Sequence, residues 1–416
     1  MNSSKALDTA NIQVRALLET HYASPEFGFL AENPVLTLSP MENFNNLYTE
    51  YFEALQTATD NLPNLIREKR ITETLAHLPP ISNYYFFRYI STRQQYWLMH
   101  MLGILTHSYF NETLEYETAG EVQKDSSIKI LPAKLAKPLW LVAQEIKTVP
   151  SFSYMLYSLY NYDIPDKTKK ISLKNIKLVH SFTGTRDEEW FVNIHQVIEK
   201  TVAPALTDLL IAAHFIELID HKKEATDVVI VKMQDAVIAL ETTLAIFKRM
   251  REQCDYRTYF DSVRKFYIFP KNVVFEGVSE TPKSFYGETG GQTPFMHTIL
   301  SLLGMYPAHI PYFPEMRLYM SGHHRALVES TLAHWNIRSF VDLYGKKNPR
   351  LVRSYNALAQ FVVDWRAEHF SLASDYIKEF GDTHGTGGTP LAWLERLHEH
   401  AKSFLIHPPP RRVIKK

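Results

Sequence analysis

Apolar residues recur at alternating spacings of four and three along this chain, and this feature restricts its possible folds more than any other. One such run consists of Met233, Val237, Leu240, Leu244 and Phe247. Residues at these spacings lie on one side of an α-helix, so the run predicts a helix over about residues 227–250 with this side in the core. Only 15 glycines occur in 416 residues, and alternating Val, Ile and Thr runs between turn signals are scarce. The sequence therefore predicts an all-α protein.

A second run with the same spacing places a histidine at a core position. It consists of Leu358, Val362, Trp365, His369, Leu372 and Tyr376. An imidazole on such a stripe either donates to a buried carbonyl or ligates a metal or a haem iron. Because buried polar groups are normally satisfied within the protein, the residues alone favour a structural role for His369 and leave the ligand role open.

Charge and cysteine content exclude several classes of protein. Lys+Arg and Asp+Glu are 45 each, so the net charge is zero and a nucleic-acid partner has no electrostatic basis. The first 30 residues lack the basic start and apolar stretch of a secretory signal. The apolar stretch 206–219 contains Asp208 and Glu217 and is shorter than the roughly 20 residues that cross a bilayer, so it is predicted to be a buried helix. The single cysteine, Cys254, excludes an internal disulfide and a cysteine-rich metal site. We expect a soluble, cytoplasmic protein with no nucleic-acid or membrane partner.

The domain organisation is predicted from two composition changes. Residues 163–175 are polar and lysine-rich after an aromatic segment, which places a boundary near residue 180. Residues 407–416, with the sequence HPPPRRVIKK, contain three consecutive prolines and cannot pack as a helix. The prediction is a small N-terminal domain over residues 1–180, a large helical domain over residues 181–406 and a tail over residues 407–416.

Two glycine-bearing segments, 287–292 and 381–389, interrupt the helical pattern and are predicted to be loops. The second contains Gly385, Gly387 and Gly388 beside two threonines. Backbone N–H groups without large side chains can approach a carboxylate, a propionate or a polar substrate edge. The glycine spacing matches neither the dinucleotide fingerprint nor the phosphate-binding loop.

Two further groups of residues are candidates for a binding site. Arg264 follows Tyr259 and Phe260, and its guanidinium either grips a substrate carboxylate or extends from a helix face into solvent, the second being the commoner case. Phe191 and His195 share a helix face at a spacing of four, where a buried structural histidine is again the simpler interpretation.

Seven segments, taken in order, resemble the indoleamine 2,3-dioxygenase family of haem enzymes, with the likeness concentrated in the second half of the chain. They are YFDSVR ending at Arg264, VFEGVSETPKSFYGETGGQ at 274–292, MRLYM at 316–320 followed by His324 and Arg325, IRSFV at 337–341, WRAEH at 365–369, DYI at 375–377 and GTGGT at 385–389. We assign the chain to a bacterial type within this family.

This resemblance implies a large helical haem-binding domain that is capped by a smaller, mainly helical N-terminal domain. It implies haem b as cofactor, dioxygen as co-substrate and His369 as the proximal ligand of the iron. The implied activity is that of an oxidoreductase of tryptophan catabolism. Dioxygen is inserted across the indole C2–C3 bond of L-tryptophan or a related indole, which gives a product of the N-formylkynurenine type on the kynurenine route.

The family pattern also implies roles for individual residues around the substrate. Arg264 matches the arginine that binds the substrate carboxylate, and Tyr259 and Phe260 match two aromatic residues, the first of which packs on the indole. Thr386 matches a threonine at the amino-acid end of the substrate, and Tyr154 matches a distal-pocket tyrosine. Phe191 and Thr289 are further expected substrate contacts, and Gly385, Gly387 and Gly388 are expected at the cofactor.

Two positions depart from the family pattern. His195 stands where mammalian members have serine and resembles the distal histidine that binds the indole N–H in tryptophan 2,3-dioxygenases, although a shift of one residue would place Ile194 there. Glu288 stands where the family has a small residue. Its carboxylate either repels a substrate carboxylate and attracts an ammonium group, or points to solvent.

Three alternative functions remain at this level. The first is a haem enzyme of secondary metabolism that acts differently on a tryptophan derivative, like the ring-rearranging enzyme of pyrrolnitrin biosynthesis. The second is a non-catalytic haem-binding sensor or carrier, and the third is a helical protein without haem. The expected partner is a small indole, and the expected assembly is a monomer or a homodimer.

Overall fold

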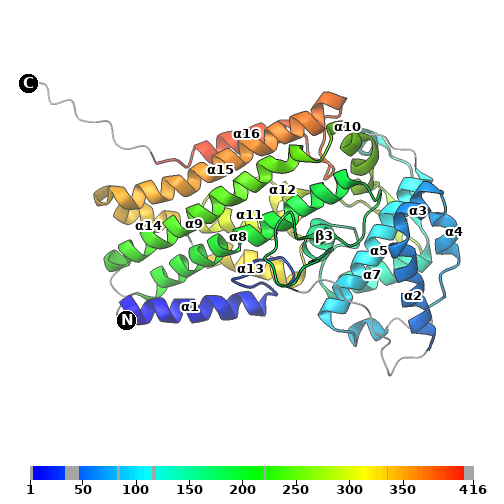
Figure 1. Cartoon of the computed structure of the whole chain (residues 1–416), viewed down its shortest axis with the longest axis horizontal. Helices are drawn as coiled ribbons and strands as arrows, with labels where there is room; N and C mark the ends of the chain where they lie inside the picture. Colours follow the sequence, from blue (N-terminus) through cyan, green and yellow to red (C-terminus); the bar gives the residue numbers. More distant parts are fainter. Residues whose placement is uncertain are drawn as a thin grey trace, which may run out of the picture.

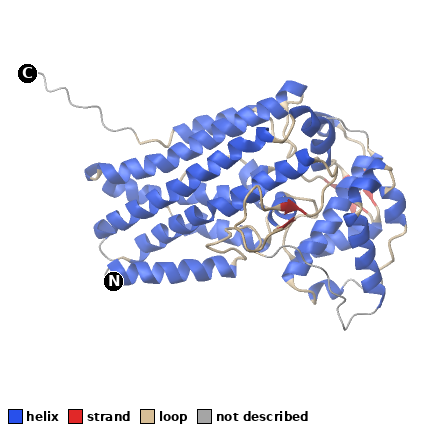
Figure 2. Ribbon diagram, in the orientation of Figure 1, coloured by secondary structure: helices blue, strands red, loops and turns tan. Residues whose placement is uncertain are grey.

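The computed structural model describes residues 3–32, 46–81, 85–114, 119–219, 222–334 and 336–406 and is mainly helical, which confirms the predicted fold class. Figure 2 shows helices throughout with only short strands between them. The α-helices of the first part are α1 (Ser3–Thr20), α2 (Asn46–Asp60), α3 (Leu62–Arg67), α4 (Ile71–Ala76), α5 (Thr92–Thr113), α6 (Ala119–Lys124) and α7 (Ala133–Glu145). Those of the second part are α8 (Arg186–Leu218), α9 (Thr226–Phe247), α10 (Tyr256–Thr258), α11 (Pro294–Leu302), α12 (Tyr312–Arg317), α13 (Gly322–His334), α14 (Ile337–Tyr344), α15 (Pro349–Tyr376) and α16 (Ala392–Lys402).

Short helical turns of other types connect these helices. Two are π-helical, η2 (Met155–Leu159) and η5 (Tyr259–Val263). The 3₁₀ turns are η1 (Tyr85–Arg88), η3 (Lys222–Ala225), η4 (Lys248–Glu252), η6 (Arg264–Tyr267), η7 (Gly290–Gln292), η8 (Gly345–Lys347) and η9 (Lys378–Phe380).

The long helices α8, α9 and α15 lie side by side, with α16 along α15 and α1 along α8 (Figure 1). The predicted helix over residues 227–250 is confirmed as α9, which continues into η4. Met233, Leu240 and Phe247 of its apolar stripe are buried, as the spacing predicts. Buried apolar residues of all five helices belong to the main hydrophobic core.

α8 begins at Thr185, whose side chain accepts a hydrogen bond from the Glu188 backbone N–H. By length and composition α8 is apolar enough to cross a membrane, but 56% of its apolar window is buried inside the protein. The stretch 206–219 is thus the buried helix segment that the sequence predicts.

A smaller group of helices surrounds α5, and its members α2, α3, α4 and α7 lie together in Figure 1. α5 begins with a capping box between Ser91 and Gln94, and nearly every residue from Gln95 to Phe110 is buried. α1 packs against α8 instead of this group, while β1 (Lys129–Leu131) pairs in parallel with β4 (Val273–Phe275) of the second part. The boundary at residue 180 stays a prediction, and the predicted tail over residues 407–416 lies outside the described residues.

The remaining strands are short. β4 also pairs antiparallel with β5 (Ser279–Lys283), which gives the order β1-β4-β5. β2 (Tyr162–Asp163) pairs antiparallel with β3 (Lys177–Leu178), so the lysine-rich stretch predicted as a linker is closed at both ends by paired strands.

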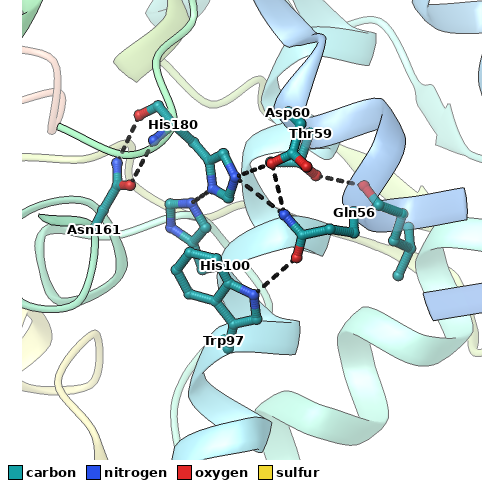
Figure 3. A network of polar contacts seen from close by, with 8 residues as sticks. Gln56, Thr59, Asp60, Trp97, His100, Asn161 and His180 are labelled. Carbon is teal, nitrogen blue, oxygen red and sulfur yellow. Dashed lines mark hydrogen bonds and ion pairs between the residues drawn. The ribbon is translucent and has the colours of Figure 1, made fainter. Parts of the chain in front are cut away.

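A chain of polar contacts joins the smaller group to the segment that leads into α8 (Figure 3). His180 lies before α8, and its Nδ1 is 3.1 Å from Nε2 of His100 on α5. Its Nε2 is 2.9 Å from the Asp60 carboxylate at the end of α2. Asn161 accepts a hydrogen bond from the His180 backbone N–H and donates one to its carbonyl. Three separate parts of the chain therefore meet at His180.

Candidate active site

A cavity with about 1460 Å³ of empty space, part of it open to solvent, lies between α8, α15, η5 and the two glycine-bearing loops. Most of its lining is apolar or aromatic, including Phe191, Tyr259, Trp365 and Leu372. The sequence-predicted site residues that line it are His369, His195, Phe191, Tyr154, Tyr259, Glu288, Thr289, Gly385 and Thr386. The fold therefore brings together residues that lie more than 200 positions apart in the sequence.

His369 lies on α15 and faces this cavity. Among the described residues the structure gives no hydrogen-bond partner for its imidazole. Burial, with smaller effects of Arg366 and His195, lowers its pKa to about 4. The ring is therefore neutral near pH 7 and has a free lone pair, as a metal-binding imidazole requires. No carbonyl group of the described residues accepts a hydrogen bond from His369, so the structural role that the residues alone favoured is not supported.

Arg366, one turn before His369 on α15, also lines the cavity. It is 8% exposed, and within the described ranges no carboxylate pairs with its guanidinium. The guanidinium lies 5.9 Å from the Phe313 ring, and burial lowers its pKa to about 10. Sequence reasoning missed Arg366. The signal was present in WRAEH, because residues three apart share a helix face.

His195, on α8, faces the cavity, whereas Ile194 is fully buried and is not among the lining residues. The His195 Nδ1 is 2.8 Å from the Phe191 carbonyl oxygen. A carbonyl only accepts, so Nδ1 carries the proton and Nε2 is left as an acceptor. Burial lowers the His195 pKa to about 4, which keeps the ring neutral near pH 7.

Aromatic rings surround His195. The Phe191 ring lies 4.7 Å from both the His195 and the Tyr259 rings, and the Tyr154 ring meets His195 edge-on at 5.8 Å. Phe260 is placed differently, because it stacks on Phe380 at 4.8 Å and does not line the cavity. Of the two adjacent aromatic residues, only Tyr259 is positioned to meet a ligand in this structure.

Arg264 does not line the cavity. Its Nη2 lies 2.9 Å from Asp382 and donates to the His384 carbonyl at 2.5 Å, and both side chains of the ion pair are 1% exposed. Phe260 covers the guanidinium at 5.3 Å. In this structure Arg264 fixes the entry to the 385–389 loop, so its predicted contact with a substrate carboxylate stays a prediction.

The two predicted glycine-bearing loops are confirmed as loops, and they interlock. The Thr386 hydroxyl donates to the Glu288 carbonyl at 2.6 Å. A Cβ on Gly287 would lie 2.0 Å from the Tyr267 carbonyl oxygen, and one on Gly387 would lie 2.7 Å from the Thr289 side chain. Only glycine permits these approaches. Gly387 and Gly388 are thus behind the cavity wall, while Gly385 reaches it.

Glu288 is 4% exposed, which rules out the solvent-facing alternative. Its carboxylate faces the cavity, and burial raises its pKa to about 8. A second buried acid, Glu199 on α8, accepts a hydrogen bond from Thr293 at 2.5 Å, and burial raises its pKa to about 7. Glu199 lies beside Tyr154, whose pKa it helps to raise.

Comparison with known proteins agrees with this site. The family model "Indoleamine 2,3-dioxygenase" matches residues 18–384. Mouse indoleamine 2,3-dioxygenase 1 is 25% identical over 94% of this chain and 96% of its own length. A 6-hydroxytryptophan 2,3-dioxygenase of Fusarium equiseti is 24% identical over 86% of this chain and 85% of its own length. A myoglobin of Haliotis madaka is 22% identical over 86% of this chain and 89% of its own length. These animal and fungal relatives give no support to the bacterial-type assignment.

The family match and the dioxygenase relatives favour the predicted activity over the ring-rearranging, carrier and haem-free alternatives. Members of the family are haem-dependent oxidoreductases that use dioxygen. The chain, whose cavity presents a free imidazole from α15 beneath an aromatic pocket, belongs to the indoleamine 2,3-dioxygenase family and is a haem-dependent dioxygenase of an indole.

Proposed function

We propose that this cavity binds haem b through His369 and holds L-tryptophan or a related indole on the side of His195. One observation carries the proposal. A neutral imidazole without a protein partner and a buried guanidinium without a counter-ion, His369 and Arg366, face the same cavity from adjacent turns of α15. Haem iron needs an imidazole lone pair and a haem propionate needs a cation, so this donor set fits the cofactor.

Haem, when bound, supplies the activation of dioxygen for its insertion across the indole C2–C3 bond. The protein supplies orientation and the exclusion of water. His195 Nε2 accepts the indole N–H, because its Nδ1 is committed to the Phe191 carbonyl. Phe191 and Tyr259 form the aromatic surface against which the indole ring packs.

The amino-acid end of the substrate lies, in this proposal, at the two interlocked loops. Gly385 and Thr386 line the cavity from one loop, and Thr289 lines it from the other. Arg264 acts here through Asp382 and the His384 carbonyl, which position the 385–389 loop. A direct contact of Arg264 with a substrate carboxylate would require the buried ion pair to open.

The test is an absorbance experiment on the haem-loaded, reduced protein that is exposed to air with L-tryptophan. We expect a histidine-ligated ferrous Soret band and the formation of N-formylkynurenine. Haem binding without product from L-tryptophan would favour a different indole substrate or the ring-rearranging class. Failure to bind haem would contradict the proposal.

Replacement of the proposed ligand gives the first prediction. His369→Ala should abolish the ferrous-histidine Soret band and product formation, while the helical circular dichroism signal persists, because no hydrogen bond within the described residues is lost and the truncated side chain costs only about 1–3 kcal/mol of folding free energy. His77→Ala is the matched control, since His77 is exposed at the C-terminal end of α4 and lies outside the cavity lining. An unchanged Soret band in His369→Ala would remove this residue from the iron.

We also propose the remaining organisation. Residues 1–180 cap a haem domain over residues 181–406, residues 407–416 form a tail, and the enzyme works in the cytoplasm as a monomer or homodimer without nucleic-acid or membrane partners. Light scattering after size exclusion distinguishes the two assembly states.

A further inference from the structure

Glu288 is the only acidic residue among those that line the described cavity. In the described part of the chain, no group donates a hydrogen bond to its carboxylate and no cation forms a salt bridge with it. A carboxyl group buried without a partner is costly, and natural proteins keep such groups mainly where they have a role. The question is which cation or donor this acid is placed to meet.

The backbone holds Glu288 firmly. Its N–H donates to the Tyr267 carbonyl at 2.9 Å, and its own carbonyl accepts from Thr386 at 2.6 Å. The close contact of Gly287 with Tyr267 leaves no room for this segment to move inward. The backbone of Glu288 is therefore fixed at the cavity wall by the same contacts that interlock the two loops.

The groups around this carboxylate are phenols. Its charge contributes to the raised pKa values of four tyrosines, namely Tyr154 and Tyr157 of the η2 segment, Tyr259 of η5 and Tyr312 of α12. Neither cation of the site neutralises it. Arg264 is paired with Asp382 outside the lining, and the pKa of Arg366 responds to burial and Tyr312 but not to Glu288.

We propose that Glu288 binds the ammonium group of the substrate and makes the enzyme select 3-(2-aminoethyl)indoles by their amine more than by a carboxylate. This inference rests on the proposed function of the same cavity. Arg366 and Glu288 then have separate partners, a haem propionate and the substrate ammonium. Arg264 is held in its ion pair with Asp382, and Arg366 is the only arginine or lysine that lines the described cavity. With Arg366 assigned to a propionate, no cation of the lining is left for a substrate carboxylate.

Binding should consequently move a proton. Because burial raises its pKa to about 8, Glu288 is mostly protonated at pH 7. An ammonium group beside it favours the ionised form and lowers that pKa. Binding of an aminoethyl indole at pH 7 should therefore release close to one proton, and the release should vanish near pH 9.5, where Glu288 is already ionised.

The first experiment compares three probes on the haem-loaded protein by changes of the Soret band: L-tryptophan, tryptamine, which lacks the carboxylate, and indole-3-propionate, which lacks the amine. We expect tryptamine to bind wild-type protein at least as well as indole-3-propionate. Glu288→Gln should weaken tryptamine and L-tryptophan about tenfold, which is about 1.4 kcal/mol, and should leave indole-3-propionate unchanged or tighter. A constant ratio of tryptamine to indole-3-propionate affinity in Glu288→Gln would overturn the inference.

Glu315→Gln is the matched control, because Glu315 bonds the Tyr286 hydroxyl outside the cavity lining and should leave all three affinities unchanged. The second experiment uses wild-type protein only, so it does not depend on whether a variant folds. Calorimetric titration of wild-type protein with tryptamine in two buffers of different ionisation enthalpy measures proton release at pH 7, and its absence would overturn the inference. If either experiment contradicts the inference but the protein still binds haem and oxidises L-tryptophan, the proposed function is retained and only the role of Glu288 is rejected.

Discussion

At the scale of single residues, the buried acids set how the protein responds to pH. Glu199 is fully buried, and burial raises its pKa from 4.5 to about 7. The unfolded chain then loses this proton at lower pH than the native protein does. The stabilisation from the bound proton is thus complete below about pH 4.5 and is lost as the pH rises through about 7.

Glu199→Gln, which keeps the shape of the protonated acid, should remove this dependence. We expect the variant to be more stable than wild type by about 1–3 kcal/mol at pH 8.5 and to differ little at pH 5. Thermal unfolding of both proteins at the two pH values measures the difference. A difference in stability that is the same at pH 5 and pH 8.5 would show that Glu199 does not titrate in this range.

The sequence identified single residues unevenly. His369 was found because its stripe and its motif agree, and Glu288 because it departs from a motif. Arg366 was overlooked although it lies three residues before His369 on the same helix. The partner of Arg264 could not be predicted, since Asp382 lies 118 positions further along the chain and no local pattern links them.

At the scale of elements, η5 explains why Arg264 is turned from the cavity. η5 is π-helical, and the Arg264 N–H bonds to the carbonyl of Tyr259 five residues earlier. Each π turn contains an extra residue, so side chains no longer follow the 3.6-residue period. α9 was predictable because its spacing is regular, whereas the direction of Arg264 relative to Tyr259 depends on a local irregularity that spacing does not reveal.

The ion pair between Arg264 of η6 and Asp382, which precedes the 385–389 loop, yields the element-scale prediction. Asp382→Asn leaves the Arg264 guanidinium buried without a counter-charge, so we expect a loss of about 3–5 kcal/mol of unfolding free energy. The less firmly held loop should also raise KM. The double variant Arg264→Leu with Asp382→Leu should recover part of the lost stability, because neither charge is then buried alone. Urea unfolding of the single and double variants checks this, and a double variant that loses the full sum would contradict it.

At the scale of the whole molecule, the contacts around His180 connect the two groups of helices (Figure 3). The Leu156 carbonyl accepts from His100 Nδ1 at 3.0 Å, and burial holds the pKa of His100 well below 6.5, so this ring is neutral and its Nε2 accepts. In its cationic form, with both ring nitrogens protonated, His180 donates from Nδ1 to His100 and from Nε2 to the Asp60 carboxylate. Through Leu156 the chain of bonds reaches η2, next to the cavity residue Tyr154.

Because His180 supplies both donors, its removal should affect the smaller group more than the larger one. His180→Ala leaves His100 Nε2 buried without a donor, which costs about 1–3 kcal/mol. Amide hydrogen exchange should then lose protection in α2 and α5, whereas α8, α9 and α15 keep theirs, since α9 packs along both α8 and α15. His21→Ala serves as the comparison, because this half-buried histidine bonds the Leu17 carbonyl at the end of α1, outside the His180 network. Equal loss of protection in all five helices would show that the two groups unfold as one unit and that the His180 contacts do not form a separable connection between them.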